Sequence, residues 1–79
     1  MSEPAEELLD TRGSLCPQPI IDLAALVKEL AVGAVVRIVS DDAAFPFDLD
    51  AWCRGMRHEL LSMTQEGRVH TGLVRKSHD

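Results

Sequence analysis

Positive charge is scarce in this sequence. Thirteen Asp and Glu residues stand against eight Lys and Arg residues, which gives a formal net charge of -5 at pH 7. The basic residues are scattered along the chain, and Arg75-Lys76 is the one adjacent pair. Since affinity for nucleic-acid phosphates depends on clustered Lys and Arg, the composition disfavours direct contact with RNA or DNA.

Long apolar runs are also absent. No stretch approaches the roughly 20 residues that a membrane-spanning helix needs, so we expect no membrane association. Residues 1–7 carry three Glu and no basic residue, which is unlike a secretory signal peptide. We therefore expect a cytoplasmic protein in which residues 1–7 form a flexible acidic tail.

The chain has two cysteines, Cys16 and Cys53, far apart in the sequence. Disulfide frameworks are rare in cytosolic proteins, and the paired Cys/His spacing of a structural zinc site is missing. A chain of 79 residues also has too thin a core to enclose a large cofactor. We therefore expect no cofactor, no metal and two free thiols.

The clearest predicted element is a helix that follows a short strand. Residues 8–12 are a strand candidate that Gly13 ends. Apolar residues then recur at 3–4 spacing, which is typical of one helix face: Ile20, Leu23, Ala24, Val27, Leu30 and Ala31. The two preceding prolines suit a first helical turn, where their missing N–H groups have no intrahelical partners. The sequence predicts a helix over residues 17–31 with Cys16 at its N-cap.

Four further elements complete the chain. Residues 34–39 are rich in Val and Ile and predict a buried strand. Pro46 marks the start of a second helix, whose apolar residues recur at i, i+3, i+4 and i+7: Leu49, Trp52, Cys53 and Met56. Residues 59–65 and 68–75 are strand candidates separated by a hairpin turn at Glu66-Gly67.

This β-α-β-α-β-β order predicts an α+β fold, a two-layer sandwich with a four-stranded mixed sheet and two helices on one face. Residues 8–76 form the single predicted domain, and residues 77–79 are a tail. The other sheet face is left uncovered and available to partners, so the sequence leaves the oligomeric state open.

Cys16 is the strongest candidate for chemistry. The N-terminus of a helix favours negative charge, and this position is expected to lower the pKa of a thiol. Pro17 and Pro19 lack N–H groups, so the amides of Gln18 and Ile20 are expected to point at the sulfur. Gly13 lets the incoming strand turn sharply toward the helix.

Other candidate residues have simpler interpretations. Free cysteines are most often inert and buried, and the place of Cys53 on an apolar helix face favours the core. Asp41 and Asp42 are expected to end a strand and cap the next helix. His58 is expected to be structural or solvated, although it could lie near a binding edge. The sequence does not settle whether Cys53 or His58 has a functional role.

The sequence resembles the TusA/SirA-like sulfur-carrier family. The resemblance rests on a strand-to-helix opening, Leu9-Asp10-Thr11-Arg12-Gly13 and Cys16-Pro17-Gln18-Pro19, which contains the family's Cys-Pro-x-Pro motif. It continues through Ser40-Asp41-Asp42, Trp52-Cys53 and His58-Glu59-Leu60 and covers residues 8–76. The family fold implied by this resemblance is also β-α-β-α-β-β.

The resemblance implies a protein-to-protein sulfurtransferase. Cys16 would take sulfane sulfur as a persulfide from a cysteine desulfurase or rhodanese-like donor and pass it to an acceptor protein. Pro17 and Pro19 would shape its loop, together with Gly13 and Gln18. Acceptors in the family feed tRNA thiolation, sulfur oxidation or cofactor assembly, and the sequence names neither donor nor acceptor. Two other functions stay open: a thiol redox sensor and a non-catalytic regulatory module that binds a partner protein.

Overall fold

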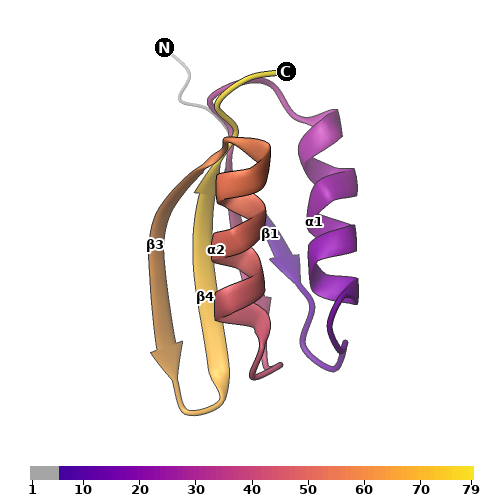
Figure 1. The fold of residues 1–79 in the computed structure, drawn as a ribbon, viewed down its shortest axis with the longest axis vertical. Helices are drawn as coiled ribbons and strands as arrows, with labels where there is room; N and C mark the ends of the chain where they lie inside the picture. Colours follow the sequence, from indigo (N-terminus) through magenta and orange to yellow (C-terminus); the bar gives the residue numbers. More distant parts are fainter. Residues whose placement is uncertain (1–5) are drawn as a thin grey trace.

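Six elements follow one another along the chain (Figure 1). The computed structural model describes residues 6–79. Within them the elements are β1 (Glu6–Asp10), α1 (Gln18–Glu29), β2 (Val35–Ser40), α2 (Phe45–Met56), β3 (Glu59–Glu66) and β4 (Val69–Arg75). The element order expected from the sequence is therefore confirmed, with small shifts at the element ends.

The strands form one mixed sheet in the order β1-β2-β4-β3. β1 and β2 run parallel, and the other neighbouring pairs are antiparallel. Parallel neighbours need a crossover connection, which α1 supplies. Both helices lie on one face of the sheet in Figure 1, so the predicted two-layer α+β fold is confirmed. Neither helix in residues 6–79 is long and apolar enough to cross a membrane.

The core lies between the helices and the sheet. Its fully buried members come one turn apart along each helix and from alternate positions of the inner strands: Leu23, Val27, Val36, Ile38, Phe45, Leu49, Cys53 and Val74. Cys53 is 2% exposed, so its predicted core position is confirmed. Met56, the last residue of the predicted stripe on this helix, is 49% exposed because α2 ends there.

Close packing of α2 on the sheet depends on Gly72 in β4. A Cβ atom at this position would overlap the side chain of Leu49, which is fully buried. The missing side chain lets Leu49 approach the strand backbone. This contact sets the distance between α2 and the sheet. It therefore also positions Asp48, an α2 residue that takes part in the site described below.

The N-terminal tail is shorter than expected. β1 begins at Glu6, so Glu6 and Glu7 belong to the sheet and pair with Val35 and Val36 of β2. Glu6 also forms an ion pair with Arg37, with 2.7 Å between the charged atoms. The expected flexible tail over residues 1–7 is therefore wrong for its last two residues, and residues 1–5 lie outside the described part of the chain.

The C-terminal residues 77–79, predicted as a tail, make contacts with the rest of the fold. The backbone N–H of Ser77 donates a hydrogen bond to His58 Nδ1 at 3.1 Å. The His78 ring stacks on His58 with 4.7 Å between the centroids, and its Nε2 lies 2.8 Å from the carbonyl oxygen of Met56. Burial, followed by the charges of His78 and Lys76, lowers the pKa of His58. These contacts match the structural one of the two roles expected for His58, structural or solvated.

Candidate functional site

Cys16 lies in the exposed turn between β1 and α1. The helix begins at Gln18, and its N-cap is Pro17, whose carbonyl oxygen accepts hydrogen bonds from the amides of Ile20 and Ile21. Cys16 therefore stands one residue before the N-cap, and its predicted N-cap position is wrong. The cysteine still occupies the corner where the chain turns from strand to helix.

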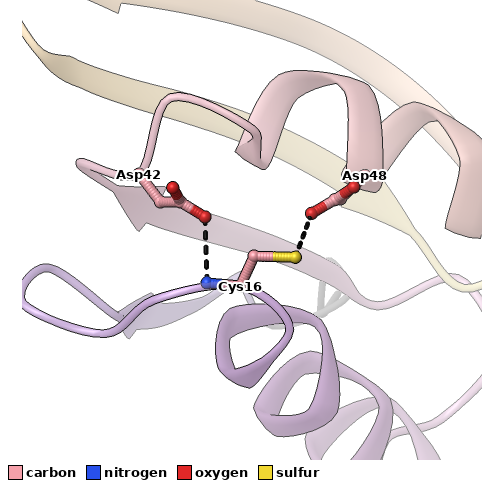
Figure 2. A group of neighbouring side chains, drawn as sticks. All are labelled: Cys16, Asp42 and Asp48. Atoms are coloured by element: carbon pink, nitrogen blue, oxygen red, sulfur yellow. Dashed lines mark hydrogen bonds between the residues drawn. The ribbon is translucent and has the colours of Figure 1, made fainter.

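Two carboxylates hold Cys16 in place, as Figure 2 shows. The thiol donates a hydrogen bond to Asp48 Oδ2 at 2.8 Å. The backbone N–H of the same residue donates to Asp42 Oδ2 at 2.9 Å. Asp42 comes from the loop between β2 and α2, and Asp48 from the first turn of α2. Three separate segments of the chain thus meet at the sulfur.

The amides expected to face the sulfur are used elsewhere. The N–H of Gln18 donates to the carbonyl oxygen of Leu15 at 2.9 Å, and that of Ile20 donates to Pro17 at 3.1 Å. These bonds close the turn and the first turn of the helix. The prediction that these two amides aim at Cys16 is therefore wrong, and the sulfur's hydrogen-bond partner is a carboxylate.

The acidic surroundings raise the pKa of the Cys16 thiol. The largest cause is its hydrogen bond to Asp48, followed by partial desolvation and then by the charges of Asp48 and Asp42. A negative charge beside sulfur disfavours the thiolate. The lowered pKa expected from the helix N-terminus is therefore wrong, because two nearby carboxylates outweigh a helix end whose amides do not reach the sulfur.

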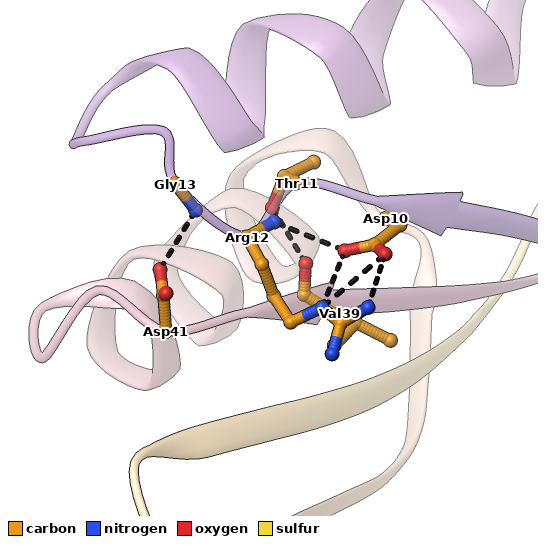
Figure 3. A network of polar contacts seen from close by, with 6 residues as sticks. All are labelled: Asp10, Thr11, Arg12, Gly13, Val39 and Asp41. Atoms are coloured by element: carbon orange, nitrogen blue, oxygen red, sulfur yellow. Dashed lines mark hydrogen bonds and ion pairs between the residues drawn. The ribbon is translucent and has the colours of Figure 1, made fainter.

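The loop before Cys16 is anchored to the end of β2 (Figure 3). The backbone N–H and the hydroxyl of the buried Thr11 both donate to the carbonyl oxygen of Val39, at 2.8 and 2.6 Å. Gly13 has φ +91, a left-handed conformation that glycine adopts without strain, and its N–H donates to Asp41 Oδ1 at 3.0 Å. The sharp turn predicted at Gly13 is present, and its partner is Asp41.

The expected capping role of the acidic pair after β2 is wrong. The α2 N-cap is Ala44, and no side chain caps this helix end. Asp41 and Asp42 instead accept hydrogen bonds from the backbone of the β1–α1 loop, at Gly13 and Cys16. Their carboxylates tie two loops together, which fixes the position of the cysteine relative to α2.

The remaining motif residues divide between surface and core. Pro19 lies in the first turn of α1 and is fully buried, so it contributes to packing as well as to the stiffness of the turn. Pro17 and Gln18 are exposed, and the amide side chain of Gln18 donates to Asp22 one helical turn later, at 2.8 Å. Of the predicted site residues, Gly13 and Cys16 donate hydrogen bonds to acidic side chains. Pro17 is the N-cap of α1, and Gln18 and Pro19 form its first turn.

One potential metal-ligand atom from each of Cys16, Asp42 and Asp48 lies within 4.8 Å of the other two. Hydrogen bonds within the protein already occupy these groups. Asp48 accepts from the thiol, and the oxygens of Asp42 accept from the amides of Cys16 and Ala44. That no metal binds here stays a prediction. A pocket of about 350 Å³ elsewhere is lined by Trp52, His58 and the C-terminal residues, and Cys16 is not part of its lining.

Asp48 is the site residue that the sequence analysis missed. A topological signal for it exists in the sequence. The carboxyl ends of parallel β1 and β2 lie at the same edge of the sheet, and both helices start there, as Figure 1 shows. An acidic residue in the first turn of the second helix therefore lies close to the start of the first helix.

Cys16 thus presents an exposed thiol at the strand-to-helix corner of a small two-layer α+β domain. Residues 7–76 match the family model described as sulfurtransferase TusA, so the chain belongs to this family. A crystal structure of a SirA-like protein from Desulfitobacterium hafniense has the same fold, with a TM-score of 0.78 and 22% sequence identity. That match covers 90% of this chain and 97% of the other. The predicted family resemblance is confirmed.

Proposed function

We propose that this protein accepts sulfane sulfur as a persulfide on Cys16 and transfers it to a partner protein. The observation that carries this proposal is the exposed Cys16 thiol, held by hydrogen bonds at the β1–α1 corner in a chain of the TusA sulfurtransferase family. The site is open to solvent, so another protein's reactive sulfur can reach it. Gly13, Pro17 and Pro19 fix the corner, and Gln18 begins the helix behind it.

The chemistry needs one nucleophile and no cofactor. Cys16 sulfur attacks the terminal sulfur of a donor persulfide, supplied by a cysteine desulfurase or a rhodanese-like protein. The donor cysteine leaves, and Cys16 carries the sulfur until an acceptor attacks it in turn. The acceptor would belong to tRNA thiolation, sulfur oxidation or cofactor assembly. Turnover is low without partners, because this chain supplies neither the sulfur nor its destination.

A redox sensor would need a second thiol to resolve an oxidised Cys16. Cys53 is unsuited to this role because it is 2% exposed, and burial raises its pKa to about 11. The thiolate is the reactive form of cysteine, so burial and a raised pKa both disfavour a reaction at Cys53 in the folded protein. Burial of the second cysteine therefore favours a carrier over a two-thiol sensor.

The test is to incubate the protein with a purified cysteine desulfurase and cysteine and then to measure its intact mass. The wild-type chain and Cys53→Ser should gain one sulfur atom, and Cys16→Ser should gain none. A gain of oxygen that depends on Cys16 would favour the sensor. An unchanged mass in every variant would favour a non-catalytic binding module.

A further inference from the structure

The two carboxylates at the site lack a cationic partner. Among the ion pairs of residues 6–79, none includes Asp42 or Asp48. Arg12 is already bound to both oxygens of Asp10: its Nε donates to Oδ1 at 3.0 Å, and its Nη2 donates to Oδ2 at 2.7 Å. Two negative charges therefore face Cys16 without compensation from the part of the chain that the structure describes.

This arrangement weakens the nucleophile in the free protein. Asp48 from α2 and Asp42 from the β2–α2 loop are the charged groups that act on the thiol, and both favour its protonated form. Only the thiolate attacks sulfur efficiently. A protonated Cys16 also resists oxidation while it is exposed to solvent. A carrier in this state needs an event that makes the thiol reactive when the correct partner arrives.

Two exposed apolar side chains adjoin the acidic cluster in sequence. Leu15, immediately before Cys16, is 75% exposed, and Phe47, immediately before Asp48, is 78% exposed. Both belong to the end of the molecule where the two helices start (Figure 1). Exposed aromatic and aliphatic anchors beside charged groups are typical of protein interfaces. We call Leu15, Cys16, Asp42, Phe47 and Asp48 the acidic docking surface.

We propose that the acidic docking surface binds the sulfur donor through a Lys or Arg set among apolar residues, and that this cation activates Cys16 by pairing with Asp48 and Asp42. The inference rests on the proposed sulfur-carrier function and adds the chemistry of the partner's contact face. Leu15 and Phe47 supply the apolar contacts. The cation offsets the negative charge that holds the proton on sulfur, so attack begins only in the complex.

Atoms and charge balance in the transfer step. The donor enters as a persulfide anion and Cys16 as a thiol. A bond forms between Cys16 Sγ and the terminal sulfur, while the sulfur–sulfur bond of the donor breaks. The thiol proton passes to the departing thiolate of the donor. Cys16 leaves as a persulfide anion and the donor as a thiol, so no other oxidant or reductant is needed.

The activation step can be tested without any sulfur donor. Cys16 is reacted with three small disulfides: cationic cystamine, neutral hydroxyethyl disulfide and anionic dithiodiglycolate. Unit charges about 4 Å apart interact in water by an amount worth about fivefold in rate. The leaving thiols of the three reagents differ in pKa, so each rate is divided by that of free N-acetylcysteine with the same reagent. Wild-type Cys16 should then favour cystamine over dithiodiglycolate about fivefold or more. Equal normalised rates with all three reagents would overturn the proposal.

Asp48→Asn tests the residue itself, and Asp50→Asn is the matched control. Asp50 lies on the same helix and pairs with Arg54, so its replacement removes the same charge away from the sulfur. Asp48→Asn should reduce the cystamine preference and increase iodoacetamide labelling at neutral pH. Because a thiolate of lower pKa is also a weaker nucleophile, the gain is about three- to fourfold per unit of pKa. Asp50→Asn should change neither rate. Identical behaviour of the two variants would refute the role of Asp48.

Phe47→Ala tests docking apart from activation. The variant should keep the wild-type disulfide preference and load sulfur from a cysteine desulfurase more slowly. Loading of the wild-type chain should fall as salt is raised, and loading of Asp48→Asn should depend less on salt. A wild-type chain that shows the charge preference but takes up no sulfur would sink the proposed function alone. Loading that is normal and independent of salt in all variants would sink this inference alone.

Discussion

Replacing Gly72 with Ala should destabilise the protein through the α2–sheet contact. The new Cβ would overlap Leu49, which is 0% exposed and belongs to the core cluster, so a shift of Leu49 would displace other core residues. Overpacking of this kind costs about 1–3 kcal/mol. Loss of glycine's freedom in the unfolded chain returns about 0.4–1 kcal/mol. The expected net loss in the free energy of unfolding is about 1–2 kcal/mol.

Thermal unfolding followed by circular dichroism measures this loss. For a domain of this size 1 kcal/mol corresponds to about 4–8 °C in Tm, so Gly72→Ala should melt roughly 5–15 °C lower. Gly55→Ala is the matched control because a Cβ there meets nothing within 4 Å and Gly55 lies in α2. Alanine has a higher helix propensity, so Gly55→Ala should raise Tm by a few degrees.

The same variant reports on the site. Leu49 follows Asp48 on α2, so pushing α2 away from β4 should weaken the contact between Asp48 and Cys16. Iodoacetamide should then label Cys16 faster in Gly72→Ala than in the wild-type chain. If Gly72→Ala melts at or above the wild-type temperature while Gly55→Ala is stabilised as expected, the described packing of α2 on the sheet is incorrect.

Two further predictions concern the burial of Cys53 in the core and the pairing of the first β1 residues with β2. Cys53→Ser should load sulfur normally but lose about 1–3 kcal/mol of stability in urea unfolding, because a hydroxyl would enter an apolar site; unchanged stability would contradict the core position of Cys53. A chain that begins at Leu8 should melt at a lower temperature than one that begins at Glu6, because it loses the pairing of Glu6 and Glu7 with β2; equal melting temperatures would mean that these pairs contribute nothing.

The sequence contained most of the information about the fold. Apolar residues at helical spacing located both helices and placed Leu23, Val27 and Cys53 in the core, because burial of one helix face leaves a periodic trace in the sequence. The parallel β1–β2 pair followed from the strand-helix-strand order. The helix start was misplaced by one residue because Pro17 itself provides the capping carbonyl, a local detail that periodicity does not encode.

The environment of Cys16 was less accessible from the sequence. Its hydrogen bonds join residues 26 and 32 positions apart, to Asp42 and Asp48. The helix N-terminus taken alone predicts the wrong direction for the pKa of the thiol, because it leaves out these two carboxylates. These contacts depend on how the β1–α1 loop meets the β2–α2 loop and the start of α2. The motif therefore pointed to Cys16 but not to the carboxylates that raise its pKa.

Cyanolysis of the loaded protein tests the central claim, that Cys16 holds a transferable sulfur, most directly. The protein is loaded by a cysteine desulfurase with radiolabelled cysteine, separated from the desulfurase and treated with cyanide. Cyanide removes the outer sulfur of a persulfide as thiocyanate and leaves the Cys16 thiolate. The account predicts about one labelled thiocyanate per wild-type or Cys53→Ser chain and none from Cys16→Ser. Label that stays bound to the wild-type chain, or equal thiocyanate release from Cys16→Ser, would contradict it.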